Sequence, residues 1–371
     1  MAKLGDIATY INGYAFKPQD WSDEGIPIIR IQDLTGNSYQ ANRYNGEYAS
    51  KYEVNDGDVL ISWSASLGVY IWHGEKAVLN QHIFKVVFDK ERISKDFFVH
   101  QVGLILENAA SDAHGATMKH LTKPVFDALP FYLPPYEKQC EIAEVLDKVT
   151  SLISLRKQQL AKLDELVKAR FVEMFGDPVV NSKRWPVETI ENHIDLLTGF
   201  PFDSSGYVSK GVNICGGLII MPQKIDWSAC KHWPQITGYE DYILRPNDIV
   251  IALDRPWISN GFKIAMVDRE HLPALLIQRT ARIRAVDINQ HYPMQSLLLG
   301  RFDKHCNITG SLVPHISPKD IKSYSVMIPP IELQNQFAAF VERVDKQKQT
   351  VQQSLEKLEL MKKALMQEYF G

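Results

Sequence analysis

The sequence predicts an α+β protein built as a tandem repeat, in which two mixed α/β, strongly β domains are separated by two long helices that form an antiparallel coiled coil. Residues 136–176 align without a gap to residues 331–371. Both segments carry apolar residues at alternating spacings of four and three, and short β-rich runs precede each of them. The expected boundaries are 1–135 for the first domain, 136–178 for the first helix, 179–330 for the second domain and 331–371 for the second helix.

The repeat is the observation on which this prediction depends. Thirteen of the 41 aligned positions are identical, whereas composition alone would give roughly two or three. The match extends upstream to a Pro-Pro pair in each copy, and weaker matches continue into the globular regions: Gly13-Tyr14-x-Phe16 with Gly199-Phe200-x-Phe202, Asp58–Ile61 with Asp248–Ile251, and Gln81 with Gln278. The chain is therefore interpreted as a duplication, with a shared helical scaffold and two different globular surfaces.

Each predicted helix begins after its Pro-Pro pair, where proline loses no hydrogen bond that the helix needs. Eight of ten positions at the four-three spacing are apolar in each helix, which indicates a coiled-coil seam. The seam positions are Ile142, Leu146, Val149, Ile153, Arg156, Leu160, Leu163, Val167, Arg170 and Met174 in the first helix, and Phe337, Val341, Val344, Lys348, Val351, Leu355, Leu358, Lys362, Leu365 and Tyr369 in the second.

Helices of about 40 residues would be about 60 Å long, so they are interpreted as a spacer. A self-contained helical hairpin without a spacing role, or a coil that joins two copies of the chain, are the alternatives. A matched pair of helices inside one chain favours the spacer.

The globular regions contain similar series of short β-rich runs. Expected strands cover 26–31, 58–63 and 78–87 in the first region and 211–221, 248–253 and 275–286 in the second, with helices at about 95–110 and 294–301. Turn dipeptides such as Asp56-Gly57 separate some of these runs. Each region is therefore expected to be an α+β domain with a largely β core.

Composition restricts the class of protein. The 371 residues are 45% hydrophobic and 23% charged, as in globular proteins with buried cores. The formal net charge is −3, so the chain as a whole lacks the basic character of many nucleic-acid binders. The four cysteines lack Cys-x-x-Cys spacing and the histidines lack metal-ligand spacing. Neither a signal peptide nor an apolar run of about 20 residues is recognised, so a cytoplasmic location is expected.

Catalytic motifs are absent from the sequence or match it weakly. The sequence has no Gly-x-x-x-x-Gly-Lys-[Ser/Thr] loop for ATP. Leu133-Pro134-Pro135-Tyr136 has leucine where amino-methyltransferases need a polar residue, so it is interpreted as a helix entry. Asp303 with Asp320-Ile321-Lys322 is a weak match to the carboxylate and lysine set of metal-dependent nucleases. The sequence therefore favours a binding protein without a metal or catalytic site of its own.

The pattern resembles the specificity subunits of type I restriction-modification systems, over essentially the whole chain. The resemblance rests on the duplication and on Leu4-Gly5-Asp6-Ile7, Gly13-Tyr14-x-Phe16, Ile26–Arg30, Gly57–Leu60, Gly115–Leu121, and Leu133-Pro134-Pro135 followed by Glu137 and Gln139. It implies that each domain is a target-recognition domain for one half of a split DNA site, and that the helices fix the unread gap.

The resemblance also implies partners. Double-stranded DNA, two methyltransferase subunits and, in the full complex, restriction subunits are expected. This chain is expected to hold no cofactor, whereas S-adenosylmethionine, ATP and Mg²⁺ are expected on the partner subunits. Two rival hypotheses are a self-sufficient methyltransferase or nuclease, and a coiled-coil adaptor that does not touch DNA.

Base reading needs side chains that form hydrogen bonds at groove edges, and phosphate contacts need positive charge or backbone amides. In the first domain the candidates are Arg30, Gln32, Ser62, Trp63, Ser64, Gln81, His82, Lys119 and His120. In the second they are Arg255, Lys263, Gln278, Arg279, Arg282 and His315. Several have structural alternatives: Trp63 as a core residue, Gln81 and Gln278 as partners of buried backbone, and Arg282 as a residue on a half-exposed strand.

Overall fold

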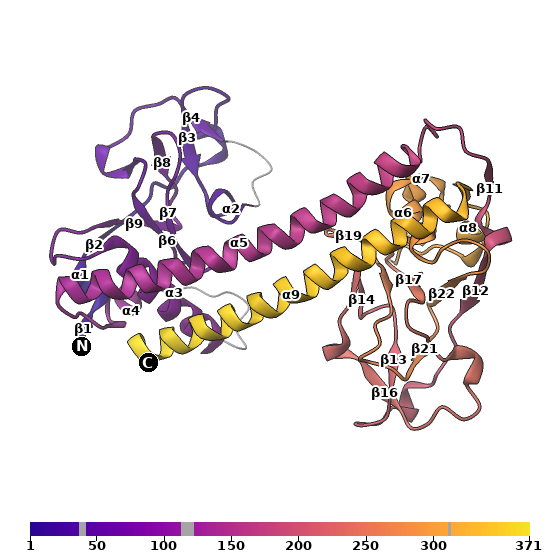
Figure 1. Cartoon of the computed structure of the whole chain (residues 1–371). Coiled ribbons are helices and arrows are strands. Elements are labelled where there is room, and N and C mark those ends of the chain that lie inside the picture. Colours follow the sequence, from indigo (N-terminus) through magenta and orange to yellow (C-terminus); the bar gives the residue numbers. More distant parts are fainter. Residues whose placement is uncertain (37–41, 113–121, 311–312) are drawn as a thin grey trace. The chain divides into compact units, whose positions relative to one another are not determined.

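The structure, a computed structural model, describes residues 1–36, 42–112, 122–310 and 313–371 (Figure 1). The chain forms two compact units. The first comprises Met1–Lys157 with Gln353–Gly371, and the second comprises Gln158–Gln352. Each unit therefore contains one globular part together with a segment of both long helices.

Among its described residues, the first globular part is built from short strands together with one long and three short α-helices. In chain order, with η for 3-10 helices, its elements are β1 (Ala2–Lys3), α1 (Leu4–Ile7), β2 (Thr9–Asn12), η1 (Pro18–Asp20), β3 (Ile26–Ile29), α2 (Ile31–Leu34), β4 (Arg43–Tyr44), η2 (Ser50–Tyr52), β5 (Glu53–Val54), β6 (Val59–Ser62), β7 (Gly68–Ile71), β8 (Ala77–Leu79), β9 (Ile83–Val87), α3 (Lys95–Asp112), α4 (Lys123–Asp127) and β10 (Pro130–Phe131).

Two four-stranded sheets organise this unit. One has the order β2-β9-β6-β7 with antiparallel neighbours, and the other has the order β4-β3-β8-β5, in which β3 and β8 are parallel. Leu60 of the first sheet packs with Ile29 and Leu79 of the second. All four residues of β6 are buried, as expected for a strand that is covered on both faces.

The second globular part repeats this layout. Its elements are β11 (Val187–Thr189), η3 (Ile190–His193), β12 (Ile194–Thr198), η4 (Ser204–Gly206), β13 (Val212–Cys215), β14 (Ile220–Met221), β15 (Lys224–Ile225), η5 (Trp227–Ala229), β16 (Lys231–Trp233), η6 (Glu240–Tyr242), β17 (Ile249–Ala252), β18 (Trp257–Ile258), β19 (Gly261–Phe262), β20 (Ile264–Met266), β21 (Ala274–Leu276), β22 (Thr280–Ala285), α6 (His291–Leu299), α7 (Phe302–His305), α8 (Pro318–Lys322) and β23 (Ser325–Met327).

Its main sheets have the strand order of those in the first unit, except that the single bridge between Ile243 and Leu275 takes the place of β5. The order β12-β22-β17-β20 corresponds to β2-β9-β6-β7, and β16-β13-β21 corresponds to β4-β3-β8 with the same parallel central pair. The duplication predicted from the helices therefore extends through both globular parts, where sequence identity alone is faint.

The two long helices confirm the prediction from the four-three spacing. Helix α5 covers Tyr136–Phe175 and helix α9 covers Ile331–Phe370. Every predicted seam position on both helices is buried or half-buried. Among the described residues, no helix is both long enough and apolar enough to cross a membrane.

The segments of α5 and α9 contact each other in both units. In the first unit, Arg156 donates a hydrogen bond to Ser354 (3.2 Å) and Lys157 pairs with Glu359 (3.0 Å). In the second unit, Lys348 pairs with Asp164 (2.5 Å), and the ring of Phe337 lies 5.5 Å from that of Phe171. In the second unit, residue numbers rise on α5 from Asp164 to Phe171 while they fall on α9 from Lys348 to Phe337, so these segments run antiparallel.

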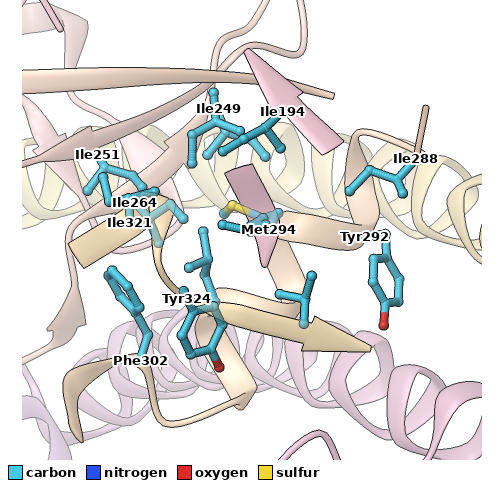
Figure 2. Packing of buried hydrophobic residues seen from close by; sticks show 14 of the residues in the cluster. Ile194, Ile249, Ile251, Ile264, Ile288, Tyr292, Met294, Phe302, Ile321 and Tyr324 are labelled. Carbon is cyan, nitrogen blue, oxygen red and sulfur yellow. The ribbon is translucent and has the colours of Figure 1, made fainter. Parts of the chain in front are cut away.

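Both helices complete the core of the second unit. Ile249, Ile251 and Ile264 of the sheet gather with Tyr292, Met294 and Phe302 from the short helices α6 and α7, and with Tyr324 from the link between α8 and β23 (Figure 2). Phe171 of α5 and Phe337 of α9 are fully buried in the same cluster. The first unit has an equivalent core, in which Ile142 and Leu146 of α5 and Leu365 of α9 pack against the globular part.

Three expected strands were wrong in the same way, because each is two strands that belong to different sheets. Residues 78–87 divide into β8 and β9, 275–286 into β21 and β22, and 211–221 into β13 and β14. At the first two breaks the backbone of Gly13 or Gly199 approaches so closely that a Cβ atom would overlap the carbonyl oxygen of Asn80 or Ile277. Glycine is required there by space.

The start of each long helix is fixed by a buried glutamine. The side chain of Gln139 accepts a hydrogen bond from the Ser94 amide (3.0 Å) and donates one to the Pro134 carbonyl (2.9 Å). Gln334 does the same with the Asn289 amide (2.9 Å) and the Pro329 carbonyl (2.8 Å). This duplicated contact explains why the Pro-Pro-x-x-x-Gln spacing recurs in the sequence.

We expect Gln334→Ala to leave two buried backbone groups without partners and to destabilise the second unit locally by about 2–3 kcal/mol. Native-state hydrogen exchange should show faster exchange of the Asn289 amide. Gln353→Ala, at an exposed position on α9, is the matched control. Unchanged protection of Asn289 in Gln334→Ala would contradict this role of the glutamine.

We expect Phe171→Ala to destabilise the second unit by about 3–5 kcal/mol, because it removes a fully buried ring from the junction of both helices and the sheet layer. Differential scanning calorimetry should show a lower melting temperature for that unit. Val172→Ala, at the exposed neighbour, should change the melting temperature little. Equal effects of the two substitutions would show that α5 does not close this core.

Candidate nucleic-acid interface

In the second unit, several predicted residues meet around the turn that follows β17. The amide of Leu253 donates to the carbonyl of Arg279 (2.9 Å), and the amide of Arg255 donates to the carbonyl of Pro314 (2.6 Å). The amide of Lys263 donates to the carbonyl of Pro256 (2.7 Å). Residues far apart in the sequence thus form one polar cluster at the end of the sheet.

This cluster is positively charged. Arg255 and Arg279 are exposed, and the guanidinium of Arg279 lies 3.5 Å from the carboxylate of Asp254. Lys263 is 7% exposed, and its ammonium group donates to the carbonyl of Gly217. Burial, and secondly the charge of Arg255, lower the pKa of Lys263. Three basic side chains around one carboxylate attract an anion such as a phosphate group.

The other two predicted residues at this end of the second unit differ in exposure. His315 is half-buried, forms a β-bridge with Asp254, and its imidazole lies 2.7 Å from the hydroxyl of Thr309. Gln278 is exposed, while its amide donates to the carbonyl of Phe200 (2.8 Å). The side chain of Gln278 therefore faces solvent beside Arg279, and His315 supports the turn.

In the first unit, the equivalent turn is aromatic, and its residues 63–67 and 80–82 include no Lys, Arg, Asp or Glu. The indole of Trp63 stacks on Phe84 with ring centroids 5.7 Å apart and lies 5.5 Å from the ring of His82. Its Nε1 atom donates to the side chain of Asn12 (3.3 Å). Gln81 contacts His82 at 3.2 Å between their Nε2 atoms. Trp63 is half-buried, so it is both a packing residue and part of the surface.

Arg30 and Gln32 lie beside this group because β3 and β8 are parallel and end at the same edge. The amide of Asn80 donates to the carbonyl of Ile29 (3.2 Å), so the residue after β3 is adjacent to the residues after β8. The guanidinium of Arg30 lies 5.2 Å from the centroid of the Trp21 ring, a cation–π contact. Both Arg30 and Gln32 are half-buried.

The two clusters occupy equivalent places in the repeat. The hydrogen bond from Leu253 to Arg279 has its counterpart in that from the Trp63 amide to the His82 carbonyl (3.4 Å). Ala65 and Arg255 follow these turns at matching positions, and both have left-handed backbone, with φ of 60° and 44°. The same backbone scaffold therefore presents two different sets of side chains.

Four predicted residues are buried, Lys263 among them, which argues against direct contact of their side chains with DNA. Ser62 is fully buried, and its hydroxyl donates to the carbonyl of Ser66 (2.6 Å), and Ser64 is 6% exposed. Arg282 is 3% exposed and donates to the carboxylate of Asp195 (2.7 Å). These side chains lack the exposed surface that a base contact needs. Lys119 and His120 lie outside the described residues.

Sequence reasoning missed other residues at these turns. Asn12 is exposed beside Trp63, and Leu218 is 94% exposed in the turn whose Gly217 carbonyl accepts from Lys263. Ser259 and Asn260 are exposed at the tip of the β18–β19 hairpin. Asn12 could have been found from the repeat, because it precedes Gly13, which matches Gly199. Leu218, Ser259 and Asn260 are single exposed residues, and no sequence pattern distinguishes them from other surface residues.

The weak nuclease match has a structural explanation. One oxygen of the Asp320 carboxylate accepts hydrogen bonds from the Ser317 amide and hydroxyl (both 2.7 Å), and the other accepts from the Asn307 amide (3.1 Å). Ser317 and Asp320 form a capping box at the start of α8. Lys322 pairs with Glu191 (2.7 Å). These groups hold the local fold together.

The chain is similar to a family of known proteins over most of its length. The family model described as type I restriction modification DNA specificity domain matches residues 1–165 and 236–360, which is more than half of the chain. The specificity subunit of the type I restriction enzyme MjaVIII of Methanocaldococcus jannaschii is 24% identical over 389 residues, covering 99% of this chain and 90% of the relative. That of EcoBI of Escherichia coli is 29% identical over 228 residues, covering 61% of this chain and 44% of the relative.

A solved structure shares the fold. The S subunit of the type I restriction-modification system of M. genitalium aligns with a TM-score of 0.58 and 13% identity, covering 100% of this chain and 95% of that chain. This likeness extends over both units and both helices, so it supports the duplicated architecture.

Proposed function

The chain belongs to the type I restriction modification DNA specificity family, and from that membership we propose that it recognises a split DNA site and directs catalytic subunits to it. The single observation that carries this proposal is the pair of equivalent turns. Each unit presents a surface built on the same backbone but with different side chains, as recognition of two different half-sites requires.

The proposed interface of the second unit combines phosphate binding and base reading. Exposed Arg255 and Arg279 supply positive charge for phosphates, and Gln278 supplies an amide that can read a base edge. Lys263 and His315 stabilise the turn, Lys263 by its hydrogen bond to the Gly217 carbonyl and His315 by its β-bridge to Asp254. Arg279 can also exchange its weak 3.5 Å pairing with Asp254 for a partner on DNA.

The proposed interface of the first unit relies less on charge. Gln81, His82, Gln32 and Arg30 supply hydrogen-bonding groups, and Trp63 offers an aromatic surface beside them. Because this surface has few cations, much of the non-specific attraction to phosphates would come from the second unit or from a partner.

We further propose that the chain is not catalytic and works with two methyltransferase subunits that modify adenine, and with restriction subunits in a nuclease complex. S-adenosylmethionine, ATP and Mg²⁺ would be bound by those subunits, in the cytoplasm. The relatives are named specificity subunits of type I restriction enzymes, which supports a role as one part of a larger enzyme.

The test is to purify the chain with its methyltransferase subunits, methylate a random duplex library, and sequence the modified molecules. We expect one bipartite motif with a fixed gap. Methylation by the chain alone would favour a self-sufficient methyltransferase, and a complex that selects no motif would favour the adaptor hypothesis. Either outcome would contradict the proposal.

We expect Arg255→Ala to weaken binding of the complex to its site and to a random duplex by similar factors, because a phosphate contact is lost. The slope of log affinity against log salt should fall by about one. Arg269→Ala is the matched control, since Arg269 is exposed at the opposite end of the same sheet, where the chain leaves β20. An unchanged salt slope in Arg255→Ala would remove this residue from the interface.

We also propose that the paired helices set the number of unread base pairs. Insertion of seven residues into both α5 and α9, between Lys157 and Gln158 and between Gln352 and Gln353, preserves the four-three seam. The gap should lengthen by up to about three base pairs, because the insertion adds about 10 Å of helix and DNA rises about 3.4 Å per base pair. Both half-sites should be unchanged.

Motif mapping of the methylated library measures this gap. A seven-residue insertion after Gln235, in an exposed loop of the second unit, should leave the gap as it is. If the elongated helices give the original gap, the helices do not act as the spacer.

A further inference from the structure

The second unit contains a β-hairpin that the first unit lacks. In the first unit, Ser62 of β6 pairs with Gly68 of β7, and residues 63–67 form the connecting loop. In the second unit, the amide of Ala252 donates to the carbonyl of Lys263 (3.1 Å), so residues 253–262 form a loop twice as long. The added residues form the short strands β18 and β19.

This hairpin has a fixed base. Trp257 pairs with Phe262 and Ile258 with Gly261. The rings of Trp257 and Phe262 stack with centroids 4.9 Å apart, and Phe262 packs on Phe302 at 5.6 Å. Phe262 is 7% exposed and belongs to the main core of the unit. Packing of this kind holds the hairpin in one orientation without help from its tip.

The tip is polar and exposed. The two turn residues, Ser259 and Asn260, are exposed, and within the described ranges the contact recorded for their side chains is a weak one between them, at 3.5 Å from hydroxyl to amide oxygen. An exposed amide side chain offers a donor and an acceptor together. That pair of groups matches the N6 and N7 edge of adenine in the major groove.

Basic residues flank the hairpin at both ends. Arg255 lies two residues before β18, and Lys263 directly follows β19. Among the residues that the structure describes, Arg255 makes no side-chain hydrogen bond or ion pair, and Arg279 lies across the same turn. A ribbon with cations at its base and a polar tip has the charge distribution of an element that enters a groove between phosphates.

We propose that the β18–β19 hairpin enters the major groove and that Asn260 is a specificity-determining residue that reads one base pair of the second half-site. The major groove is about 12 Å wide and admits a two-stranded β-ribbon. This inference rests on the proposed function, which it deepens by naming one reading element. It also accounts for an ordered hairpin that the repeated fold does without in its first copy.

The experiment maps the methylation motif of the full complex for Asn260→Ala and Asn260→Asp. Asn260→Ala should lower discrimination at one position of the second half-site by about tenfold to a hundredfold. The first half-site and the gap should be unchanged. Asn260→Asp should also weaken binding of the complex to DNA, because the new carboxylate would enter a groove lined by phosphates. Circular dichroism and complex assembly should match the wild type.

Gln235→Ala, which removes an exposed amide from another loop of the same unit, is the control and should leave the motif intact. If both Asn260 variants keep the wild-type motif at every position, the inference is overturned. A uniform loss of binding without a change of preference would assign Asn260 to a phosphate or partner contact and would also overturn it. If the wild-type complex selects no bipartite motif, the failure lies in the proposed function.

Discussion

Each globular core is closed by segments of both long helices, and the rest of the structure depends on this packing. Phe171 of α5 and Phe337 of α9 meet in the core of the second unit, and Ile142 of α5 and Leu365 of α9 pack in that of the first. Short strands form most of each globular part, and such small sheets need a further apolar layer to be stable. The helices supply that layer. The first unit therefore includes the last residues of the chain, from Gln353 onward, and its fold depends on contacts between residues far apart in the sequence.

This arrangement explains why the helices resemble each other more than the globular parts do. Residues of α5 and α9 have to satisfy three partners at once, namely the other helix, the sheet layer and the Pro-Pro entry that Gln139 and Gln334 hold in place. Substitution at such positions leaves a cavity or an unpaired buried group. The turns at the sheet ends have no such restriction, since only their backbone hydrogen bonds are shared between the copies.

The sequence predicted the parts of the fold that repeat with a period. The four-three spacing located both long helices and their buried faces, and the alignment of the copies located the turns that carry Gln81 and Gln278. The sequence did not predict that β8 and β9 belong to different sheets. Strand β8 pairs with β3 and strand β9 pairs with β6, and these partners lie elsewhere in the chain. For the same reason the sequence predicts surface positions for Ser62 and Arg282, which are buried. Both lie on strands between other strands, where alternation of side chains does not show which faces are covered.

The equivalent turns show how one scaffold can carry two recognition surfaces. The left-handed backbone at Ala65 and Arg255 is the same in both copies, although only one of these residues carries a charge. A residue with a side chain in that conformation is unfavourable by itself, so the hydrogen bonds around the turn must hold it. Since these bonds join backbone atoms, such as the Leu253 amide and the Arg279 carbonyl, side chains can change without loss of the turn. A fixed backbone with exchangeable side chains is what a protein needs if each of its two halves is to acquire its own DNA sequence.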